Sequence, residues 1–327
     1  MSPSRNRVRT PALLVAVLTT ITVLLTGCGP SAPGGTPASP SGGPGSSAAT
    51  EAFPRDIDVD GTTVHLDTQP TSIVILGPSL TETAFAIGAG PQVKAVDKLS
   101  SYPADAPVSD LDAFKPSAEA VAAQQPDLVL VSNDGNNLVA GLTKLKIPVA
   151  VLAAPTDLDA ALMQFILVGQ LTGHTAAAEK LATDTRATID TAVASVSSAG
   201  DRAKKSYYWE LDPTFYTVTS STFIGSVLAE FGLENIADSA PEAAGGYPQL
   251  SAEFIIDADP DVIFLADSKC CQQSAGTVAR RAGWDVTRAV KDPDAVVALD
   301  DDVASRWGPR IGDLATTIAA ALQKLQD

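Results

Sequence analysis

The segment SAEAVAAQQPDLVLV (Ser117–Val131) returns in register as SAEFIIDADPDVIFL (Ser251–Leu265). Both copies contain Ser-Ala-Glu, a short amphipathic stretch, Pro-Asp and a run of branched apolar residues suited to a buried strand. Solenoid repeats recur about every 20–50 residues, so a helix–strand unit repeated at this much longer interval predicts two similar lobes. Two lobes of one architecture form a cleft, and such clefts are where ligands usually bind.

The rest of the chain alternates between strand patterns and helix patterns. One helix is expected to start at a capping box formed by Ser79 and Glu82. Alternation with few hairpin turns predicts an α/β protein whose lobes have mainly parallel sheets. Strands are expected at Ser72–Leu76, Val93–Asp97, Val149–Leu152, Ser206–Glu210 and Ala295–Leu299, after an edge hairpin at Ile57–Thr68.

A long helical stretch separates the two halves of the chain. Asp157–Leu171 and Thr175–Val196 have helix-forming composition and apolar residues at helical spacing, interrupted at Gly173-His174. The second part could span about 30 Å, which would make a stiff connection between the lobes. The expected domains are an N-terminal lobe at 55–172, an interlobe helix at 173–200 and a C-terminal lobe at 201–327.

The first 27 residues have the pattern of a signal peptide. Arg5, Arg7 and Arg9 form a basic start, and Pro11–Leu25 supplies an apolar stretch too short for a comfortable membrane span. The sequence Leu-Thr-Gly-Cys that ends at Cys28 resembles a bacterial lipobox, in which the cysteine becomes the lipid-modified first residue of the mature chain. An ordinary secretory signal with an incidental cysteine is the alternative.

A tether and a strong negative charge follow from composition. Residues 28–54 are rich in Gly, Pro, Ser and Ala and cannot bury enough surface to fold, so they are expected to form a flexible tether. The formal net charge of −16 at pH 7 argues against nucleic acid and against electrostatic binding to anionic lipid. The lipid on Cys28, rather than charge, is therefore expected to hold the protein at the membrane.

Further stretches, taken in order with the repeat, carry a resemblance to a known family. In this order they resemble the helical-backbone substrate-binding proteins, the ABC-importer receptors for cobalamin, ferric siderophores and haem. The resemblance covers about residues 55–325. The stretches are SIVILGPSLTETAFAIGAG at 72–90, the loop with Tyr102-Pro103, LDPTFYT at 211–217, FIGSVLAEFG at 223–232, GYPQLS at 246–251 and SRWGPRI at 305–311.

The resemblance implies the fold of class III periplasmic binding proteins, with two Rossmann-like lobes joined by one long helix and the ligand held in the cleft. It also implies a monomer outside the cytoplasm that delivers its ligand to the permease dimer of an ABC importer. The stretch from Tyr247 to Arg310 looks most like the vitamin B12-binding branch. The chain departs from that branch around Leu111–Ala113, where an aromatic residue is expected before the first repeat, and at Tyr247, where tryptophan is usual.

Four aromatic side chains are candidates for ligand binding because they lie in or beside loops that would face the cleft. Flat aromatic rings can stack on a corrin, porphyrin or catecholate face at little entropic cost. The alternative for each is a half-buried ring that packs at a strand end. These candidates are Tyr102, Tyr216, Tyr247 and Trp307, whereas Trp209 and Trp284 are predicted to lie in the core.

Charged candidates lie close to Trp307. Arg306 and Arg310 follow an aspartate run that ends at Asp302. The planar fork of arginine suits phosphate or carboxylate groups, such as those of a corrinoid nucleotide loop or an anionic siderophore. Asp302 could accept hydrogen bonds from ligand amides. The alternatives are an ion pair between arginine and the neighbouring aspartates and an acidic run that is merely solvated.

Glu119 and Glu253 occupy the same position in the two copies of the repeat. Each follows a serine, Ser117 or Ser251, in the first turn of a helix, where the helix dipole stabilises a carboxylate. Equivalent positions in similar lobes should expose the two carboxylates at matching points on the outer face. The family resemblance implies that such a pair docks onto basic pockets of the twofold importer.

Cys270 and Cys271 are adjacent in the sequence. In an oxidising compartment they could form a disulfide between neighbours, although Cα atoms about 3.8 Å apart are closer than the usual range of about 4.4–6.8 Å. Such a bridge would make a rigid turn at the edge of the cleft. Two free thiols and a soft-metal site are the alternatives; we expect the disulfide.

The histidines of this chain are too few for most metal and nucleophile chemistry. His65 and His174 lie in an expected edge strand and a helix break, so they are not expected to meet. A receptor for bare Zn²⁺ or Mn²⁺ needs several imidazoles at one site, and a Ser-His-Asp or Cys-His nucleophile needs a histidine as its base. No metal site, no cofactor and no enzymatic activity are therefore expected.

The sequence thus predicts a lipid-anchored extracytoplasmic receptor that captures a chelated metal compound, with a corrinoid such as cobalamin first and a ferric siderophore second. The alternative from another class is a secreted hydrolase that uses paired carboxylates from the aspartate-rich loops. Such an enzyme would have to place two carboxyl groups with separated pKa values around a scissile bond, and no motif here does so.

Overall fold

The computed structural model describes residues 51–197, 205–240 and 244–325. Cys28, the expected signal peptide and the expected tether up to residue 50 lie outside the described residues. Within the described part of the chain, no helix is long and apolar enough to cross a membrane.

The N-terminal lobe is built on a four-stranded parallel sheet. Its strands lie in the order β4-β3-β5-β6. An antiparallel hairpin precedes it, as expected, with β1 at Arg55–Val59 and β2 at Thr62–Leu66. The sheet strands are β3 (Ile73–Leu76), β4 (Val93–Val96), β5 (Leu128–Val131) and β6 (Val149–Val151), and the helices are α1 (Pro78–Ala86), α2 (Ala118–Ala122) and α3 (Leu138–Lys144).

The C-terminal lobe repeats this topology. Its parallel strands lie in the order β10-β9-β7-β8, so in both sheets the first strand of the lobe pairs with its second and third, and the third pairs with its fourth. The strands are β7 (Ser206–Glu210), β8 (Glu234–Asn235), β9 (Val262–Leu265) and β10 (Val296–Ala298), and the helices are α6 (Phe223–Glu230), α7 (Ala252–Ala258), α8 (Ala275–Val278), α9 (Arg288–Lys291), α10 (Asp301–Ala304) and α11 (Ile311–Lys324). The α/β fold with two parallel-sheet lobes is thereby confirmed.

The Pro-Asp step of the repeat has the same contact in both lobes. The Asp127 carboxylate accepts hydrogen bonds from the backbone N–H groups of Thr71, at 2.8 Å, and Ser72, at 3.0 Å, just before β3. In the second copy the Asp261 carboxylate accepts from the N–H of Ser206, at 2.8 Å, where β7 begins. In each lobe the aspartate before the third strand therefore ties down the start of the first strand.

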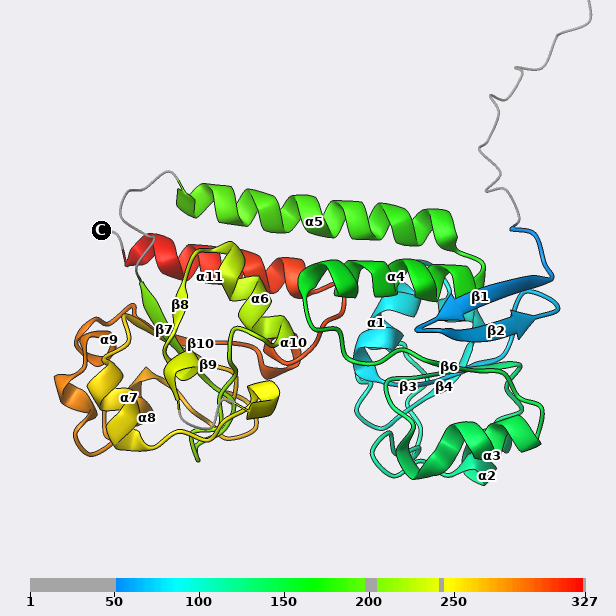
Figure 1. Cartoon of the computed structure of the whole chain (residues 1–327), viewed down its shortest axis with the longest axis horizontal. Helices are drawn as coiled ribbons and strands as arrows, with labels where there is room; N and C mark the ends of the chain where they lie inside the picture. Colours follow the sequence, from blue (N-terminus) through cyan, green and yellow to red (C-terminus); the bar gives the residue numbers. More distant parts are fainter. Residues whose placement is uncertain (1–50, 198–204, 241–243, 326–327) are drawn as a thin grey trace, which may run out of the picture. The chain divides into compact units, whose positions relative to one another are not determined.

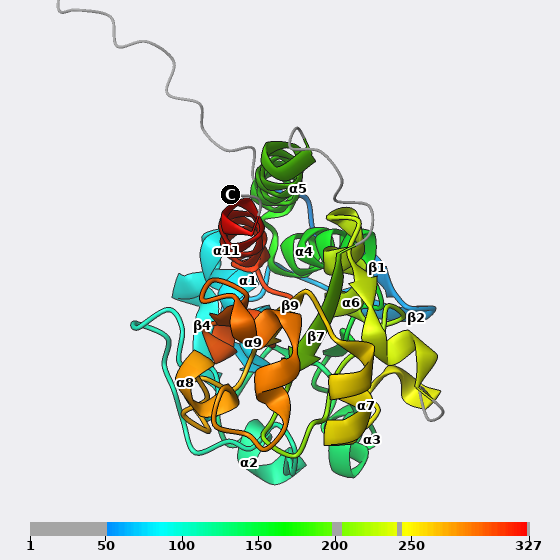
Figure 2. The ribbon, with the colours of Figure 1, turned by 90° about the vertical axis from the view of Figure 1, so that its left-hand side faces the viewer.

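Two helices, rather than one, bridge the lobes. α4 (Leu158–Thr172) and α5 (Thr175–Ser197) lie alongside each other, and α11 packs against α5 (Figures 1 and 2). The first half of α4, including Phe165, is buried in the C-terminal core, and its second half, including Leu171, is buried in the N-terminal core. The expected boundary at residue 172 assigned α4 to the N-terminal lobe alone, whereas the helix contributes to both cores.

A close approach of backbones allows this bridge to pack. A Cβ atom at Gly169 of α4 would lie 2.4 Å from the Cβ of Ala178 on α5, so only glycine fits at that point. The turn between the two helices passes through Gly173, whose φ of +78° lies in the left-handed region that glycine adopts without strain. The Gly-His break in the sequence is therefore a tight helix–helix turn.

The predicted capping box at the start of α1 is wrong. The helix begins after Gly77 with Pro78 in its first position, and no side chain among the described residues caps it. Proline suits this position because its φ is already helical and the missing N–H would lack a helical partner anyway. Glu82 instead turns its carboxylate away from the helix start, toward arginines of the other half of the chain.

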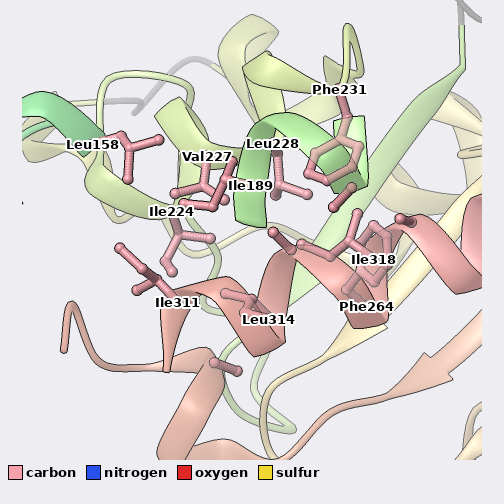
Figure 3. Packing of buried hydrophobic residues seen from close by; sticks show 14 of the residues in the cluster. Leu158, Ile189, Ile224, Val227, Leu228, Phe231, Phe264, Ile311, Leu314 and Ile318 are labelled. Carbon is pink, nitrogen blue, oxygen red and sulfur yellow. The ribbon is translucent and has the colours of Figure 1, made fainter. Parts of the chain in front are cut away.

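The largest core lies in the C-terminal lobe, where α4, α5, α6 and α11 cover the sheet. Apolar side chains from these helices point toward one another and toward Phe264 of β9 (Figure 3). Trp209 and Trp284, which were predicted to be core residues, are 0% and 1% exposed. Two of these helices, α4 and α5, also form the bridge. This core therefore connects the two lobes as well as stabilising the C-terminal one.

Candidate functional site

A cavity of about 690 Å³ lies where the carboxyl ends of the two sheets face each other. On the N-terminal side it is lined by Gly77 and Ser132, which directly follow β3 and β5. On the C-terminal side it is lined by Leu211 and Ala266, which directly follow β7 and β9. Ligands of open α/β sheets bind beyond the carboxyl ends of the strands, so this cavity is the candidate binding site.

The wall of this cavity combines exposed apolar side chains with a few polar groups. Phe114 is 74% exposed and Leu99 is 41% exposed, although both are large apolar residues. Half-buried Trp307 contributes from the opposite lobe. Ser79 and Asn133 add a hydroxyl and an amide. Apolar walls with a small number of polar groups are typical of small-molecule sites.

Phe114 is the site residue that the sequence analysis missed. The aromatic residue expected before the first repeat was considered replaced around Leu111–Ala113, yet Phe114 follows directly and faces the cavity. The available signal was its place three residues before Ser117, where the repeat begins. Phe114 is therefore an aromatic residue of the cavity wall that lies just before the first copy of the repeat.

A buried carboxylate joins the two lobes beside the cavity. Glu82 of α1, whose side chain is 2% exposed, accepts hydrogen bonds from Arg306 Nη1 at 3.2 Å and from Arg310 at 2.9 Å (Nε) and 2.6 Å (Nη2). This hydrogen bonding raises the pKa of Arg310. Gly308 lies between the arginines, and a Cβ there would be 3.1 Å from Glu82 Oε2. We call Glu82, Arg306 and Arg310 the interlobe ion cluster.

Further hydrogen bonds from Arg306 and Trp307 connect this arginine-containing segment to the N-terminal half of the chain. The backbone N–H of Trp307 donates to Ser79 Oγ at 3.2 Å, and its indole N–H donates to Gln164 Oε1 at 2.9 Å. Arg306 also donates to the Leu99 carbonyl, at 3.2 Å, and to Asp302, at 2.7 Å. Arg306 thus lines the cavity with both Nη1 and Nη2 already paired, and the alternative of an ion pair with the neighbouring aspartates holds for it.

Tyr102 and Arg310, both expected to bind ligand, contact each other. The Arg310 guanidinium carbon lies 4.2 Å from the centroid of the Tyr102 ring, a cation–π geometry. Together with Glu82 and Phe85 they line a second cavity of about 370 Å³. Their roles as ligand contacts stay predictions.

Tyr216 and Tyr247 are not among the described residues that line either of these two cavities. They are 42% and 55% exposed, and an isolated antiparallel bridge links Tyr216 to Gln249. Of the aromatic candidates from the sequence, the 690 Å³ cavity therefore includes Trp307, and a role for the other three depends on how far a ligand extends beyond it.

The carboxylates at the cavity already have partners. Asp301 accepts hydrogen bonds from the N–H groups of Lys269, at 2.9 Å, and Cys270, at 2.8 Å. Asp302 accepts from Lys269 Nζ at 3.3 Å as well as from Arg306. A hydrolase would need one of these groups to face substrate as an acid or base. Their engagement in the protein's own hydrogen bonds speaks against that alternative.

Comparison with known proteins identifies the family. The family described as "Periplasmic binding protein" matches residues 73–303, which include both sheets. The chain belongs to this family. Its recognition from the sequence as a substrate-binding protein of this type is thereby confirmed.

Relatives of this periplasmic binding protein carry related names. A cobalamin-binding protein of Halobacterium salinarum is 33% identical over 63% of this chain and 56% of its own length, so the chain spans little more than half of that relative. An uncharacterized ABC transporter substrate-binding lipoprotein of Bacillus subtilis is 28% identical over 90% of this chain and 92% of its own. A vitamin B12-binding protein of Pectobacterium carotovorum is 28% identical over 78% of this chain and 90% of its own.

Among solved structures, a periplasmic haem-binding protein of Roseiflexus, in apo form, superposes with a TM-score of 0.68. It is 25% identical, and the match covers 78% of this chain and 99% of that one. The shared architecture agrees with the two-lobe fold described above.

A second buried acidic site in this periplasmic binding protein was not foreseen from sequence. Glu210, at the end of β7, accepts two hydrogen bonds from Arg281, at 2.6 and 2.5 Å. Asp267, two residues after β9, is 0% exposed, and neither of its carboxyl oxygens has a hydrogen-bond donor in the described structure. Burial, together with the charge of Glu210, raises the pKa of Asp267 to about 7. A proton on Asp267 lets one of its oxygens donate to Glu210, which gives that oxygen a partner and removes the repulsion between the two carboxylates.

The interlobe ion cluster should contribute strongly to stability. Glu82→Gln leaves two arginines without their buried carboxylate, so the free energy of unfolding should fall by about 3 kcal/mol, the low end for a broken buried pair because both arginines keep some exposure. Urea unfolding followed by tryptophan fluorescence measures this. Asp184→Asn is the matched control, because it breaks the exposed Lys180–Asp184 pair and should cost less than about 1 kcal/mol. Equal losses in the two variants would contradict the role of the cluster.

The buried Asp267 should make stability depend on pH. Its pKa is higher in the folded chain than in the unfolded chain, so its contribution is complete below about pH 4 and is lost as the pH rises to about 7. Asp267→Asn keeps a neutral donor at all pH values. The variant should melt several degrees above the parent at pH 8, and the difference should become much smaller at pH 5.

Thermal unfolding at pH 5, 6, 7 and 8 provides the measurement. The control is Asp257→Asn, which changes an exposed aspartate on α7 and should shift the melting temperature little at every pH. An Asp267→Asn variant that is destabilised to the same degree at pH 5 and pH 8 would refute the buried proton.

Proposed function

We propose that this chain is the solute-binding receptor of an ABC importer, held outside the cytoplasm by a lipid on Cys28, and that its interlobe cavity captures a chelated metal compound. The observation that carries the proposal is the 690 Å³ cavity between the carboxyl ends of two equivalent sheets, with Phe114 and Leu99 exposed inside it. Exposing large apolar side chains to water is unfavourable, and a ligand that covers them in a concave site removes this cost.

The composition of the cavity wall favours a ligand whose metal brings its own ligands. Among the described residues that line the cavity there is no histidine, tyrosine or methionine, and Cys270 is bonded to Cys271. These side chains are the usual axial ligands of haem iron. A haem would find none of them here, whereas a corrinoid or a ferric siderophore needs none. The names of the Halobacterium and Pectobacterium relatives support ranking a corrinoid ahead of a ferric siderophore.

The cavity offers both kinds of contact that a corrinoid requires. Phe114 and Trp307 belong to opposite lobes and can cover the ring with apolar surface, while Asn133 and Ser305 can pair with its amide side chains. Two separate contacts hold the lobes together: the interlobe ion cluster and the packing of the two bridge helices, α4 and α5. Binding therefore requires only a limited change of lobe angle.

Docking onto the importer is assigned to Glu119 and Glu253. Each lies exposed in the first turn of its helix, after a serine that caps it: Ser117 accepts from Ala120 N–H at 3.2 Å and Ser251 from Phe254 N–H at 3.1 Å. Their helices, α2 and α7, lie on the side of the two lobes away from α5 (Figures 1 and 2). Matching carboxylates on matching lobes suit a partner with twofold symmetry and basic pockets.

The ligand proposal is tested by calorimetric titration of residues 49–327, which form one compact unit, with cobalamin, cobinamide, haem and a ferric siderophore. Cobalamin should bind, and Phe114→Ala should weaken it by about 1–3 kcal/mol, the usual cost of removing a central anchor. Leu145→Ala removes an exposed leucine that is not part of the described cavity wall and should leave affinity unchanged. Haem binding without cobalamin binding would overturn the ligand assignment.

The docking proposal is tested by uptake. The double variant Glu119→Ala with Glu253→Ala should abolish stimulation of the importer, while ligand affinity and melting temperature stay near those of the parent. A matched control replaces two other exposed glutamates, Glu179→Ala with Glu234→Ala, and should leave uptake intact. Normal uptake by the first double variant would contradict the docking proposal and leave Glu119 and Glu253 with a role only in stabilising the starts of their helices.

A further inference from the structure

Cys270 and Cys271 form a disulfide between neighbours, with Cα atoms 3.8 Å apart, in the turn that follows β9. Groups from two elements fix this turn. The Asp301 carboxylate of α10 accepts the N–H of Cys270 at 2.8 Å, and the carbonyl of Asp267 accepts the N–H of Cys271 at 3.2 Å. The turn therefore has one defined position at the end of the strand.

The position of the bridge is informative because Cys270 lines the ligand cavity together with Arg306 and Trp307. Cys270 is exposed, whereas Cys271 is half-buried. One of the two sulfur-bearing residues thus faces the space that a ligand would fill, and the other is partly covered by protein.

Global stability does not account for this bond. A disulfide stabilises a fold chiefly by closing a loop in the unfolded chain, and the effect grows with loop length. A bond between adjacent residues closes almost no loop. Within the described residues no group of three or more His, Cys, Asp or Glu could hold a metal ion here, so a metal site does not explain the pair either. What the bond controls is the local shape of the cavity wall.

The turn is also linked to the interlobe ion cluster. Lys269, directly before Cys270, pairs through its ammonium group with Asp300 at 2.6 Å and Asp302 at 3.3 Å. Asp302 in turn pairs with Arg306 at 2.7 Å. A change in the backbone at 269–271 would therefore shift side chains on a second wall of the cavity.

We propose that the Cys270–Cys271 bridge is a redox-sensitive contact element of the ligand cavity. In the oxidised form the turn presents a fixed apolar sulfur surface to the ligand. In the reduced form two separate thiols loosen the turn and affinity falls. The proposal rests on the proposed function of the cavity as a ligand site.

The reductant is a dithiol. Its thiolate attacks the sulfur of the exposed Cys270, which forms a mixed disulfide and releases the Cys271 thiolate; its second thiol then displaces Cys270. The protein gains two electrons and two protons to give two thiols, and the dithiol becomes a disulfide. A ligand in the cavity covers Cys270 and blocks the attack. By linkage, the factor by which reduction weakens ligand binding equals the factor by which ligand stabilises the bridge.

The test uses residues 49–327, in which Cys270 and Cys271 are the only cysteines. Intact mass first establishes the redox state: the purified protein should be two hydrogens lighter than after dithiol treatment. Cobalamin, cobinamide and a ferric siderophore are then titrated into the oxidised protein and into protein that was reduced, alkylated with iodoacetamide and freed of reagent. Reduction should weaken the ligand that binds best at least fivefold. Saturation with that ligand should slow reduction of the bridge by dithiothreitol.

The double variant Cys270→Ser with Cys271→Ser separates loss of the bridge from the bulk of the alkylating group. Its ligand affinity should equal that of the reduced protein and should not change when dithiothreitol is added. Its melting temperature should stay close to that of the parent. Free thiols in the purified protein, or equal affinity of the oxidised, reduced and serine forms, would overturn the proposal while the cavity remains a ligand site. Absence of binding by any probe to any form would overturn the proposed function, and the proposal with it.

Discussion

The buried carboxylate of Glu82 sets the relation between the lobes on which the binding cavity depends. A carboxylate that is 2% exposed would be very costly to bury alone, and here it is neutralised by two arginines that follow it by more than two hundred residues. Asp302 pairs with one of these arginines and balances the remaining positive charge. Since the arginines flank Trp307, satisfying Glu82 also brings that ring to the cavity wall.

The second determinant is the equivalence of the two sheets. Both have the same strand order, and in both an aspartate before the third strand holds the start of the first. The bridge helices α4 and α5 contribute apolar residues to both cores, so the sheets are placed with their carboxyl ends toward one cavity. The cavity is thus a consequence of repeating one parallel-sheet lobe, and its chemistry comes from the loops that each lobe adds.

The polar groups around the cavity divide into those that build it and those that remain free for a ligand. The hydrogen bonds described above for the charged groups at the cavity are to other groups of the protein; these charged groups are Asp301, Asp302 and Arg306. Phe114 and Leu99, by contrast, are large apolar side chains left open. This division favours recognition of a ligand by its shape and apolar faces over recognition by charge. It also explains why a chain so rich in aspartate does not resemble a hydrolase at this site.

The sequence by itself determined the architecture of this protein. Apolar runs, helical spacing and the Ser-Ala-Glu…Pro-Asp repeat are local patterns that depend on neighbours in the chain. They predicted the strands of both sheets except the two-residue β8, a helical link between the lobes and the equivalence of Glu119 and Glu253. Only the tertiary structure decided which side chains meet. Ser79 and Glu82 fit a capping box by spacing, but arginines distant in sequence offer Glu82 a stronger, charged partner. Asp267 looks like an ordinary strand-end aspartate until the fold buries it beside Glu210. Contacts of this kind join residues that are far apart in the sequence, between lobes for Glu82 and between neighbouring strands for Asp267, so a local sequence pattern cannot predict them.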